Sequence, residues 1–562
     1  MTARHVVVIG GGLAGITAAI GLREAGVDVT LLEARPWLGG ATCSFSRGGL
    51  AIDNGQHVFL RCCFAYRDLL ARLGVTGSVA IQDRFDVTVL APGGRARLRR
   101  SGLPGPLHMA RALAGYSFLS PFDRLAVARG ALAMRFANPA RPGLDSSRLG
   151  DWLGARGQRE KARRRLWDLF IVSTLNIAGD EANVGLAATV IRTALLGRKD
   201  AADIGVPTVP LGELHGRAAA ALLGRLGADV RLGAKAIAVE QDAGGGFRVR
   251  AVSGADGSDP RLSGNRGSQE LDADGMAPGT GAPGGGTAAA VAGAEGMTAD
   301  PAGRVIRADG VVVAVPAWAA MRLVPAAEEA AAARWAGLGT SPIVNVHVIY
   351  DRRVTRLPFA AAVDSPVQWV FDKTRQAGLK AGQYLAVSLS AAQDYVDVPS
   401  AALREKFLPA LTELFPAARD AGVTDFFVTR ERRATFRQGP GCSTLRPGAA
   451  TSLRGLVLAG AWTDTGWPDT MEGAVQSGLT AAQEMKHELA AVPNAAASAS
   501  PAGQAAGAAG PAGSVSGQAA GGPAGSVSGQ AAGVAGPAGA CGQPASEAGH
   551  AASAGAAAGA SS

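Results

Sequence analysis

The chain has 562 residues, a formal net charge of +9 and a hydrophobic fraction of 47%, which suits a protein with a large buried core. Its five cysteines show no C-x-x-C spacing and argue against a disulfide framework or a zinc site, so we expect no metal. The arginines are not accompanied by a recognisable nucleic-acid-binding module. Attraction to anionic lipid headgroups would explain the positive charge better than nucleic-acid binding. A solvated basic surface without a binding role is the simplest interpretation.

The first predicted element is a buried strand at Val6–Ile9, an apolar β-branched run typical of a parallel sheet. A helical pattern over 14–25 and a second buried strand, Val27–Leu32, follow, and the strand ends in Glu33, whose carboxylate can accept hydrogen bonds from ribose hydroxyls. Between the first strand and the helix stand three glycines with G-x-G-x-x-G spacing, Gly10, Gly12 and Gly15. They permit a tight turn, approach of a pyrophosphate and close packing of helix on strand, so this order predicts a Rossmann-like nucleotide-binding unit of α/β class.

A second glycine-containing loop follows directly after this unit. Arg35 can pair with a pyrophosphate or a ribose, and the Gly39-Gly40 pair lets the main chain pass close to a cofactor. A plain NAD dehydrogenase does not need this extension. Its presence favours FAD, whose isoalloxazine ring must lie deep in the protein.

A dense polar cluster, DNGQH at 53–57, follows a short hydrophobic strand at 49–52. Active-site groups often lie at such strand ends, although a turn held by local side-chain hydrogen bonds is the alternative. His57 suits a structural or flavin-facing donor better than a catalytic proton carrier.

Residues 60–200 are predicted to be mostly helical, with apolar residues at helical spacing in 64–73, 107–134 and 166–196. Charged residues and a proline interrupt the middle segment too often for it to span a bilayer. It could line an apolar substrate tunnel, pack as ordinary helical core or lie against a membrane surface.

The cofactor-domain pattern returns from Pro210, with a helix and then strands predicted at 230–232, 236–240 and 311–315. Strand-like runs and one helix, near 400–414, then predict an antiparallel substrate lobe. The strands of this lobe are expected at 344–350, 384–390 and 425–430.

The last structured stretch is predicted to close the cofactor site. A buried strand at 456–458 turns at Gly460, and a helix begins near Thr470 with Glu472 and Gly473 in its first turn. A helix N-terminus against the flavin would stabilise the negative charge of the reduced ring. The two ends of the structured chain therefore form one nucleotide site across a long insertion.

Two stretches lack any apolar face to bury, a Gly/Ala-rich insertion near 253–302 and a tail after about Val492 that repeats PAGSVSGQAAG, so we expect both to be disordered. The first strand begins too early to leave room for a signal peptide, which predicts a cytoplasmic protein. The expected organisation is an FAD-binding domain from 1–60, 205–252, 303–320 and 451–491, a helical substrate- or membrane-facing part at 61–200, a substrate domain at 321–450, and disordered segments at 253–302 and 492–562.

The opening VVVIGGGLAGITAAIGLREAGVDVTLLEARPWLGG and the closing LAGAWTDTGWPDTMEGAVQSG resemble the FAD-dependent amine oxidase and phytoene desaturase superfamily. Within it, DNGQH at 53–57, LWDLFIVSTLN at 166–176 and TGWPDTMEGAVQSG at 465–478 resemble the squalene-associated FAD-dependent desaturases, the hydroxysqualene dehydroxylases. The resemblance covers about residues 5–490 apart from the insertion. It implies a Rossmann-like FAD-binding domain built from separated segments, with a mixed α+β substrate domain.

The resemblance also implies which residues hold the cofactor. Val230 lies on the strand that would contact adenine. The ADP half of FAD would be bound by Gly10, Gly12, Gly15, Glu33, Arg35, Gly39 and Gly40. The pyrophosphate, ribityl chain or flavin would lie near Gly460, Trp462, Glu472, Gly473 and Ala474.

The reaction of the resembled family removes a hydroxyl group reductively from hydroxysqualene and gives squalene for squalene and hopanoid synthesis. Ionisation next to a double bond gives an allylic cation, so an acid must protonate the departing oxygen and reduced flavin must supply hydride. Candidates for the acid are Asp53, His57 and Asp469. The apolar helical part would bury the isoprenoid and exclude water.

Three other functions remain open. An oxidative carotenoid-type desaturase would use the same fold with hydride flowing the other way, and an amine oxidase fits less well because only 5% of the residues are aromatic. A non-catalytic flavin-fold scaffold for isoprenoid enzymes belongs to a different class. We expect an isoprenoid substrate, peripheral contact with the inner face of a membrane, and an electron donor that the sequence does not identify.

Overall fold

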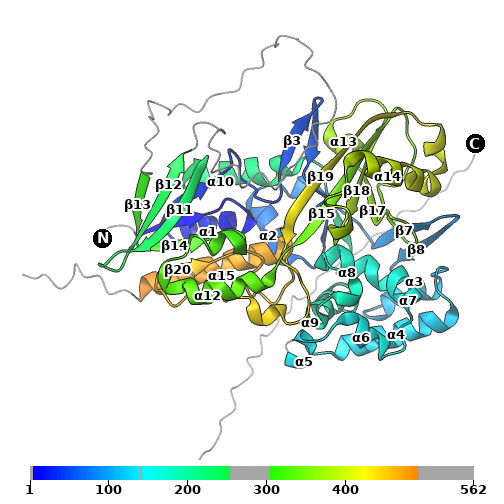
Figure 1. Ribbon diagram of the computed structural model, residues 1–562, viewed down its shortest axis with the longest axis horizontal. Coiled ribbons are helices and arrows are strands. Elements are labelled where there is room, and N and C mark those ends of the chain that lie inside the picture. Colours follow the sequence, from blue (N-terminus) through cyan, green and yellow to red (C-terminus); the bar gives the residue numbers. More distant parts are fainter. Residues whose placement is uncertain (1–3, 140, 254–303, 492–562) are drawn as a thin grey trace, which may run out of the picture. The chain divides into compact units, whose positions relative to one another are not determined.

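A computed structural model describes residues 4–139, 141–253 and 304–491, which all belong to one compact unit (Figure 1). The two segments predicted to be disordered, 253–302 and 492–562, lie outside the described residues except for Ser253, the last residue of a strand. The described chain combines a parallel sheet, a second large sheet and a group of helices, as the predicted α/β domain with a mixed substrate domain requires.

A five-stranded parallel sheet forms the centre of the predicted cofactor domain, in the strand order β10-β2-β1-β14-β20. The central strand is apolar and buried on both faces, and its Val7 pairs with Thr30 on one side and Val311 on the other. The strands are β1 (His5–Ile9), β2 (Asp28–Glu33), β10 (Asp229–Leu232), β14 (Gly310–Val313) and β20 (Leu456–Leu458). Distant segments therefore assemble one sheet, which confirms the predicted split domain.

Two helices from opposite ends of the sequence pack against each other beside this sheet (Figure 1). They are α1 (Leu13–Glu24) and α15 (Met471–Ala490). A Cβ atom added to Gly478 would lie 2.3 Å from the carbonyl oxygen of Ala14, so only glycine permits this approach. The contact fixes the C-terminal motif helix next to the N-terminal one.

Smaller elements surround the parallel sheet. An antiparallel sheet has the order β11-β12-β13, with strands β11 (Ala234–Gln241), β12 (Phe247–Ser253) and β13 (Arg304–Ala308). The hairpin β3 (Ser44–Arg47) and β4 (Leu50–Asp53) carries the polar cluster at its end, and β5 (Phe59–Leu60), β9 (Ile204–Pro207) and β6 (Val79–Ile81) form a small sheet. The accompanying helices are α2 (Phe64–Arg72), α10 (Ala218–Arg225), α11 (Ala317–Ala320), α12 (Glu329–Trp335) and α13 (Thr374–Ala377).

The largest sheet belongs to the predicted substrate lobe and is called the substrate sheet below; it has seven strands in the order β19-β15-β18-β17-β16-β7-β8. Its strands are β7 (Asp86–Ala91), β8 (Gly94–Arg99), β15 (Ser341–Tyr350), β16 (Phe359–Ala362), β17 (Trp369–Asp372), β18 (Gln383–Leu389) and β19 (Val423–Thr435). The buried side chains of α14 (Ser400–Leu414), among them Phe407, cover one face of the sheet. All strand pairs are antiparallel, as predicted, except for the parallel pair β16–β7.

The prediction that residues 60–200 are mostly helical is wrong for 79–99, which form β6, β7 and β8. In β8 the side chains of Ala96 and Leu98 are buried while the alternating arginines point to solvent, a period of two residues that marks a strand. The many arginines of this stretch make its apolar residues hard to recognise as one face of a strand. Because β7 and β8 join the substrate sheet, this stretch belongs with that sheet and not with the helices.

The remaining part of 100–200 is helical and lies next to the substrate sheet (Figure 1). The helices are α3 (Ala110–Ala114), α4 (Pro121–Phe136), α5 (Pro142–Asp145), α6 (Leu149–Gly154), α7 (Glu160–Ala162), α8 (Asp168–Leu175) and α9 (Val184–Val190). The helix predicted over 107–134 breaks before Ser120, whose hydroxyl oxygen accepts from the Asp123 N–H at 3.2 Å and starts α4. Within the described stretches, no helix combines the length and the apolarity needed to cross a bilayer.

Candidate functional site

The glycine turn after β1 has the geometry that the motif predicts. Gly10 has φ +108, and a Cβ atom added to it would lie 2.3 Å from the carbonyl oxygen of Ala314. A Cβ atom on Gly15 would lie 1.9 Å from the carbonyl oxygen of Gly10, so the helix can pack here only without a side chain. Gly12 is the N-cap residue of α1, which leaves the first amides of the helix free for an anion.

Glu33 lies at the end of β2, beside this turn. One carboxylate oxygen, Oε2, accepts from the Gly11 N–H at 2.7 Å, and Oε1 accepts from the Arg35 N–H at 2.9 Å. The side chain is buried. The carboxylate is therefore held at the carboxyl edge of the parallel sheet, where a ribose would lie in a nucleotide site.

The second glycine loop lies against the first. Gly39 donates its N–H to the carbonyl oxygen of Gly11 at 2.8 Å, and a Cβ atom on Gly40 would lie 2.8 Å from Cα of Gly12. The Arg35 guanidinium donates from Nη1 to the carbonyl oxygen of Gly40 at 3.0 Å. The two loops thus form one surface of backbone atoms and one cation.

Val230 lies on the edge strand of the same sheet. In the parallel pairing of β10 with β2 it stands opposite Leu31 and is half-buried. After this strand, Gly233 donates its N–H to the carbonyl oxygen of Arg35 at 3.0 Å. The strand predicted to contact adenine is therefore tied to the loops predicted to bind phosphate.

The loop after β20 reaches the same edge of the sheet. Gly460 has φ +139 and donates its N–H to Oγ of Ser477 in α15 at 2.9 Å. The indole of Trp462 is buried, donates from Nε1 to the carbonyl oxygen of Val315 at 2.9 Å, and packs against Trp335 with ring centres 5.1 Å apart. Trp462 is thus a fixed wall of the site.

A buried arginine that the sequence analysis missed holds this loop. Arg446 donates to the carbonyl oxygens of Ala461 at 3.1 Å and Trp462 at 3.3 Å, and also to that of Thr463. Burial lowers the pKa of its guanidinium. No motif includes this residue, because its partners are backbone carbonyls that any sequence would offer.

Glu472 connects α15 to another helix. Its carboxylate accepts from the N–H groups of Ala65 at 3.1 Å and Tyr66 at 2.8 Å, the first turn of α2. Gly473 and Ala474 follow in the first turn of α15. The carboxylate therefore acts first as a cap for α2, and its contact with a cofactor stays a prediction.

Asp53 is buried, and its carboxylate accepts hydrogen bonds from four donors. Oδ1 accepts from Oγ of Ser44 at 2.7 Å and from the Leu211 N–H at 3.0 Å. Oδ2 accepts from Nζ of Lys373 at 3.0 Å and from Nε2 of Gln376 at 2.7 Å. Burial lowers the pKa of Lys373 and the Asp53 charge opposes that effect. Because both carboxylate oxygens are held by these four donors, Asp53 suits a structural role better than a catalytic one.

His57 is suited to a neutral hydrogen-bonding role. It is half-buried, its Nδ1 lies 3.3 Å from the carbonyl oxygen of Gly55, and burial lowers its pKa. Burial and the nearby His57 lower the pKa of His215 to about 3, and Nε2 of His215 lies 2.7 Å from the Tyr66 hydroxyl. Burial thus disfavours the protonated form of both imidazoles, and the role of His57 as a donor to a flavin stays a prediction.

Asp469 is the candidate acid whose pKa suits donation of a proton to a leaving group. Burial raises the pKa of its carboxyl group to about 6, while the hydrogen bond from the Phe436 N–H (2.9 Å) and the charge of Arg446 oppose that shift. The side chain is half-buried and immediately precedes the N-cap of α15. A group of this kind is partly protonated near neutral pH.

A second acid lies among the motif residues and was missed from the sequence. Burial raises the pKa of Glu431, on β19, to about 7, against the opposing effects of the Arg35 charge and a hydrogen bond with Asn54. In β19 it stands opposite Ile343. The local sequence, a glutamate between arginines in a strand, gave no sign that folding would bring it to the cofactor loops.

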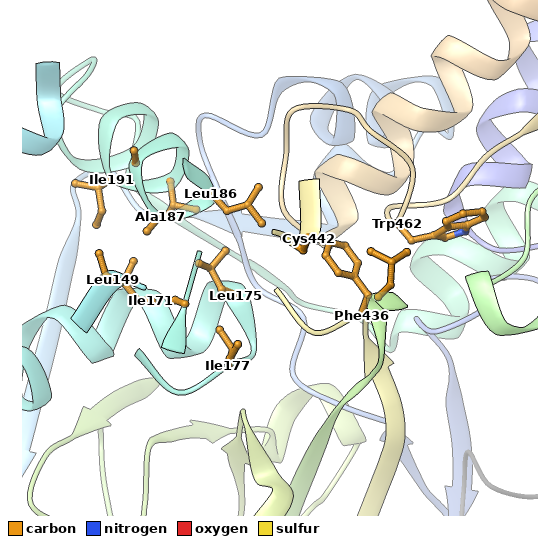
Figure 2. Close-up of a cluster of buried hydrophobic side chains, with 14 of the residues drawn as sticks. Leu149, Ile171, Leu175, Ile177, Leu186, Ala187, Ile191, Phe436, Cys442 and Trp462 are labelled. Atoms are coloured by element: carbon orange, nitrogen blue, oxygen red, sulfur yellow. The ribbon is translucent and has the colours of Figure 1, made fainter. Parts of the chain in front are cut away.

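A buried apolar cluster extends from the helical part of the chain to Trp462 (Figure 2). Leu175 of α8 and Leu186 of α9 come from the helical part. Phe436 and Cys442 come from the segment after β19, and Trp462 comes from the loop after β20. Because Phe436 also donates its N–H to Asp469, the candidate acid lies beside this apolar wall.

Three buried polar atoms near the predicted site lack a hydrogen-bond partner, and a bound flavin could supply one. Nε2 of Gln56, Oδ1 of Asn345 and Nδ1 of His215 are buried without a hydrogen-bond partner. A Cβ atom on Gly55 would lie 3.4 Å from Nδ2 of Asn345, which places Asn345 beside the DNGQH cluster. Unpaired buried donors and acceptors call for a ligand or water, and the polar edge of an isoalloxazine ring offers complementary groups. Together with the glycine cradle, these residues fit FAD.

Within the described residues, no cluster of side chains is suited to a metal ion. No group of three or more His, Cys, Asp or Glu side chains there could hold a metal ion. The described cysteines, Cys43, Cys62, Cys63 and Cys442, are all free thiols.

Comparison with known proteins places this site in a family. The family model described as flavin containing amine oxidoreductase matches residues 13–259 and 293–486. A hydroxysqualene dehydroxylase of Rhodopseudomonas palustris is 28% identical over 487 residues, which cover 85% of this chain and 97% of that protein. A zeta-carotene desaturase of Arabidopsis thaliana is 25% identical over 527 residues, which cover 85% of this chain and 84% of that protein.

A solved structure supports the fold. The cyclohexylamine oxidase of Brevibacterium oxydans superposes with a TM-score of 0.57 at 19% identity and covers 87% of this chain and all of that one. The family match spans most of the chain and includes the helix after the glycine turn and the C-terminal motif helix. The chain therefore belongs to the flavin-containing amine oxidoreductase family and is an FAD-dependent oxidoreductase.

Proposed function

We propose that this protein removes the hydroxyl group of hydroxysqualene reductively and forms squalene, within squalene and hopanoid biosynthesis. The observation that carries the proposal is the carboxyl group of Asp469, with its pKa raised to about 6, beside a buried apolar wall. The dehydroxylase of R. palustris supports it, because the similarity spans 97% of that protein.

The proposed reaction balances with two electrons and two protons. The allylic C–O bond breaks, one proton converts the departing hydroxyl group to water, and a new C–H bond forms at the same allylic system. Bound reduced FAD supplies the hydride for this bond, and an external reductant must restore it after each turnover. Protonation of the leaving oxygen is the part that the protein's own side chains must perform.

Asp469 is the proposed proton donor. Its protonated form is available near neutral pH because burial disfavours the carboxylate. Glu431 offers a second protonated carboxyl group, beside Arg35 and Asn54, and can replace the transferred proton. Asp53 and His57 take supporting roles, the first as an ion-paired anchor and the second as a neutral hydrogen-bonding group.

The apolar cluster has a chemical purpose in this proposal. A cation formed from hydroxysqualene would be captured by water unless the surrounding walls exclude it. Leu175 of α8, Leu186 of α9 and Phe436, directly after β19, provide such walls (Figure 2). The same surface would hold the hydrocarbon chain by burying its apolar area.

Cofactor binding is assigned to the residues of the glycine loops and the C-terminal motif. We propose that Glu33 accepts from the ribose hydroxyls and that Arg35 pairs with the pyrophosphate, while Val230 contacts adenine. The backbone at Gly10, Gly12, Gly15, Gly39 and Gly40 would contact the ADP half. The flavin half would lie near Gly460, Trp462, Glu472, Gly473 and Ala474.

Anaerobic mixing of the chemically reduced enzyme with hydroxysqualene tests the proposal. Return of the oxidised flavin absorption together with squalene formation is the expected result. An oxidised carotenoid precursor formed by the oxidised enzyme, with no response to hydroxysqualene, would support a desaturase instead. The zeta-carotene desaturase similarity, which covers 84% of that protein, is the observation that favours this second candidate.

The isoprenoid substrate dissolves in membranes, so we propose that the protein works in contact with the inner face of a membrane. A protein that binds flavin but turns over neither class of substrate would support the scaffold alternative. The same anaerobic assay can identify the electron donor, because only a suitable cellular reductant will restore the reduced flavin.

A further inference from the structure

A cavity of about 520 Å³ opens between the C-terminal end of α4 and the helical turn that follows α9. It is lined by two arginines, two threonines, a phenylalanine, a proline and a glycine. The lining residues are Arg135, Phe136, Pro139, Thr189, Arg192, Thr193 and Gly197. Guanidinium and hydroxyl groups in one cavity are a donor set for a phosphate.

The two guanidinium groups are anchored at this position. Arg135 donates from Nη1 to the carbonyl oxygen of Leu196, and Arg192 donates from Nη1 to the carbonyl oxygen of Ala137 at 2.8 Å. Each guanidinium carries five N–H donors, so one anchoring bond leaves the others for a ligand. Anchored arginines lose less side-chain freedom when an anion binds.

An exposed apolar face on α4 begins at the edge of this cavity. Phe122, Leu125, Leu132 and Phe136 are 78%, 60%, 55% and 77% exposed, at helical spacing along one side of the helix. Phe136 belongs both to this α4 face and to the cavity wall. Large exposed apolar side chains gathered in one place mark a surface for a partner or a membrane.

The charge around the α4 face identifies the partner. Residues 101–141 contain five arginines and one acidic residue, Asp123. That carboxylate is buried and accepts from the Ser120 hydroxyl at 2.6 Å at the start of α4, so it does not offset the arginines at the surface. Arg129 is exposed and lies on the same side of α4 between Leu125 and Leu132, so this side combines apolar side chains with an arginine and fits an anionic lipid surface.

We propose that the cavity binds the phosphodiester headgroup of an anionic phospholipid while the α4 face lies among the acyl chains. This inference rests on the proposed membrane contact and deepens it by naming the surface, the lipid chemistry and the binding residues. Arg135 and Arg192 hold the phosphate, and Phe136 marks the level at which headgroup gives way to hydrocarbon.

The test is flotation of the full-length protein with vesicles of phosphatidylglycerol or of phosphatidylcholine. Binding to the anionic vesicles only, weakened by salt, is the expected result. The double variant Arg135→Gln/Arg192→Gln should partition roughly 30-fold more weakly, since one arginine near such a surface is worth about fivefold. Two exposed arginines elsewhere, changed as Arg353→Gln/Arg419→Gln, are the matched control.

The apolar contribution has its own pair of variants. Leu125→Gln/Leu132→Gln should weaken partitioning to the phosphatidylglycerol vesicles by roughly tenfold or more, because two exposed leucines no longer enter hydrocarbon. Ile237→Gln/Val305→Gln changes two exposed apolar residues of the antiparallel sheet β11-β12-β13 and should have little effect. Melting temperatures of all variants show whether each remains folded.

Equal binding to both kinds of vesicle, or no binding by the wild type, would overturn the proposal. The proposal would also be overturned if Arg135→Gln/Arg192→Gln lost no more vesicle binding than its control variant. Competition by millimolar glycerol 3-phosphate without any vesicle binding would assign the cavity to a soluble phosphate instead. Arg135→Lys/Arg192→Lys should recover part of the binding. Flotation needs no turnover, so failure here and failure with hydroxysqualene are separate results.

Discussion

The ion pair between Asp53 and Lys373 offers the sharpest test of what the DNGQH cluster does. The two side chains are 2% and 7% exposed, so removing one charge leaves the other buried without a partner. In Asp53→Asn the oxygen can still accept from Ser44 and Leu211, but the new amide nitrogen faces the donors of Lys373 and Gln376. Breaking a buried pair in this way costs about 3–5 kcal/mol of unfolding free energy.

Chemical denaturation of flavin-saturated protein measures this cost. Asp53→Asn should lose about 4 kcal/mol, and adding Lys373→Met should recover about half of that loss because the unpaired charge is gone. Asp397→Asn, which breaks an exposed pair with Arg432, is the matched control and should change stability by less than about 1 kcal/mol. An Asp53→Asn protein as stable as the wild type that has lost only turnover would refute the anchoring role and return Asp53 to the catalytic candidates.

Three further predictions follow from the site. Gly15→Ala should abolish flavin retention, because the new Cβ would lie 1.9 Å from the carbonyl oxygen of Gly10. The ratio of flavin to protein absorbance measures this retention. The control is Gly224→Ala, where no atom lies within 4 Å of the new Cβ; this variant should retain flavin and gain up to about 1 kcal/mol in unfolding free energy. Turnover that needs protonated Asp469 should fall as pH rises through about 6, and Asp469→Asn should remove this dependence along with most of the activity. Glu472→Gln should cost about 1 kcal/mol by weakening the cap of α2 while flavin stays bound. Loss of flavin at unchanged stability would instead make Glu472 a cofactor ligand.

The cofactor half of the fold was predictable because its geometry constrains local sequence. Gly10 and Gly15 must lack side chains for the turn and the helix to pack, so the constraint is visible as spacing over six residues. The strands of the parallel sheet are short apolar runs that are buried on both faces, which makes them recognisable one at a time.

The site residues that were missed depend on contacts between distant parts of the chain. Lys373 meets Asp53 across 320 residues, and nothing in its own neighbourhood predicts that encounter. Arg446 acts on backbone carbonyls, and Glu431 acquires its raised pKa only from the burial that folding produces. Charge and hydrogen-bonding capacity can be read from sequence, whereas burial of a single polar side chain is a property of the assembled fold.

The split parallel sheet also has a consequence for synthesis on the ribosome. The central strand β1 pairs with β2 at once, but its other partner, β14, lies roughly 300 residues further along the chain. At about 5–20 residues per second, that edge of β1 waits roughly 15–60 s for its partner. An apolar strand edge left open for so long invites pairing with other nascent chains, so chaperone occupancy should persist until β14 has emerged. If the C-terminal motif forms half of the nucleotide site, as we propose, nucleotide capture must follow the emergence of α15, which comes after β14 in the chain.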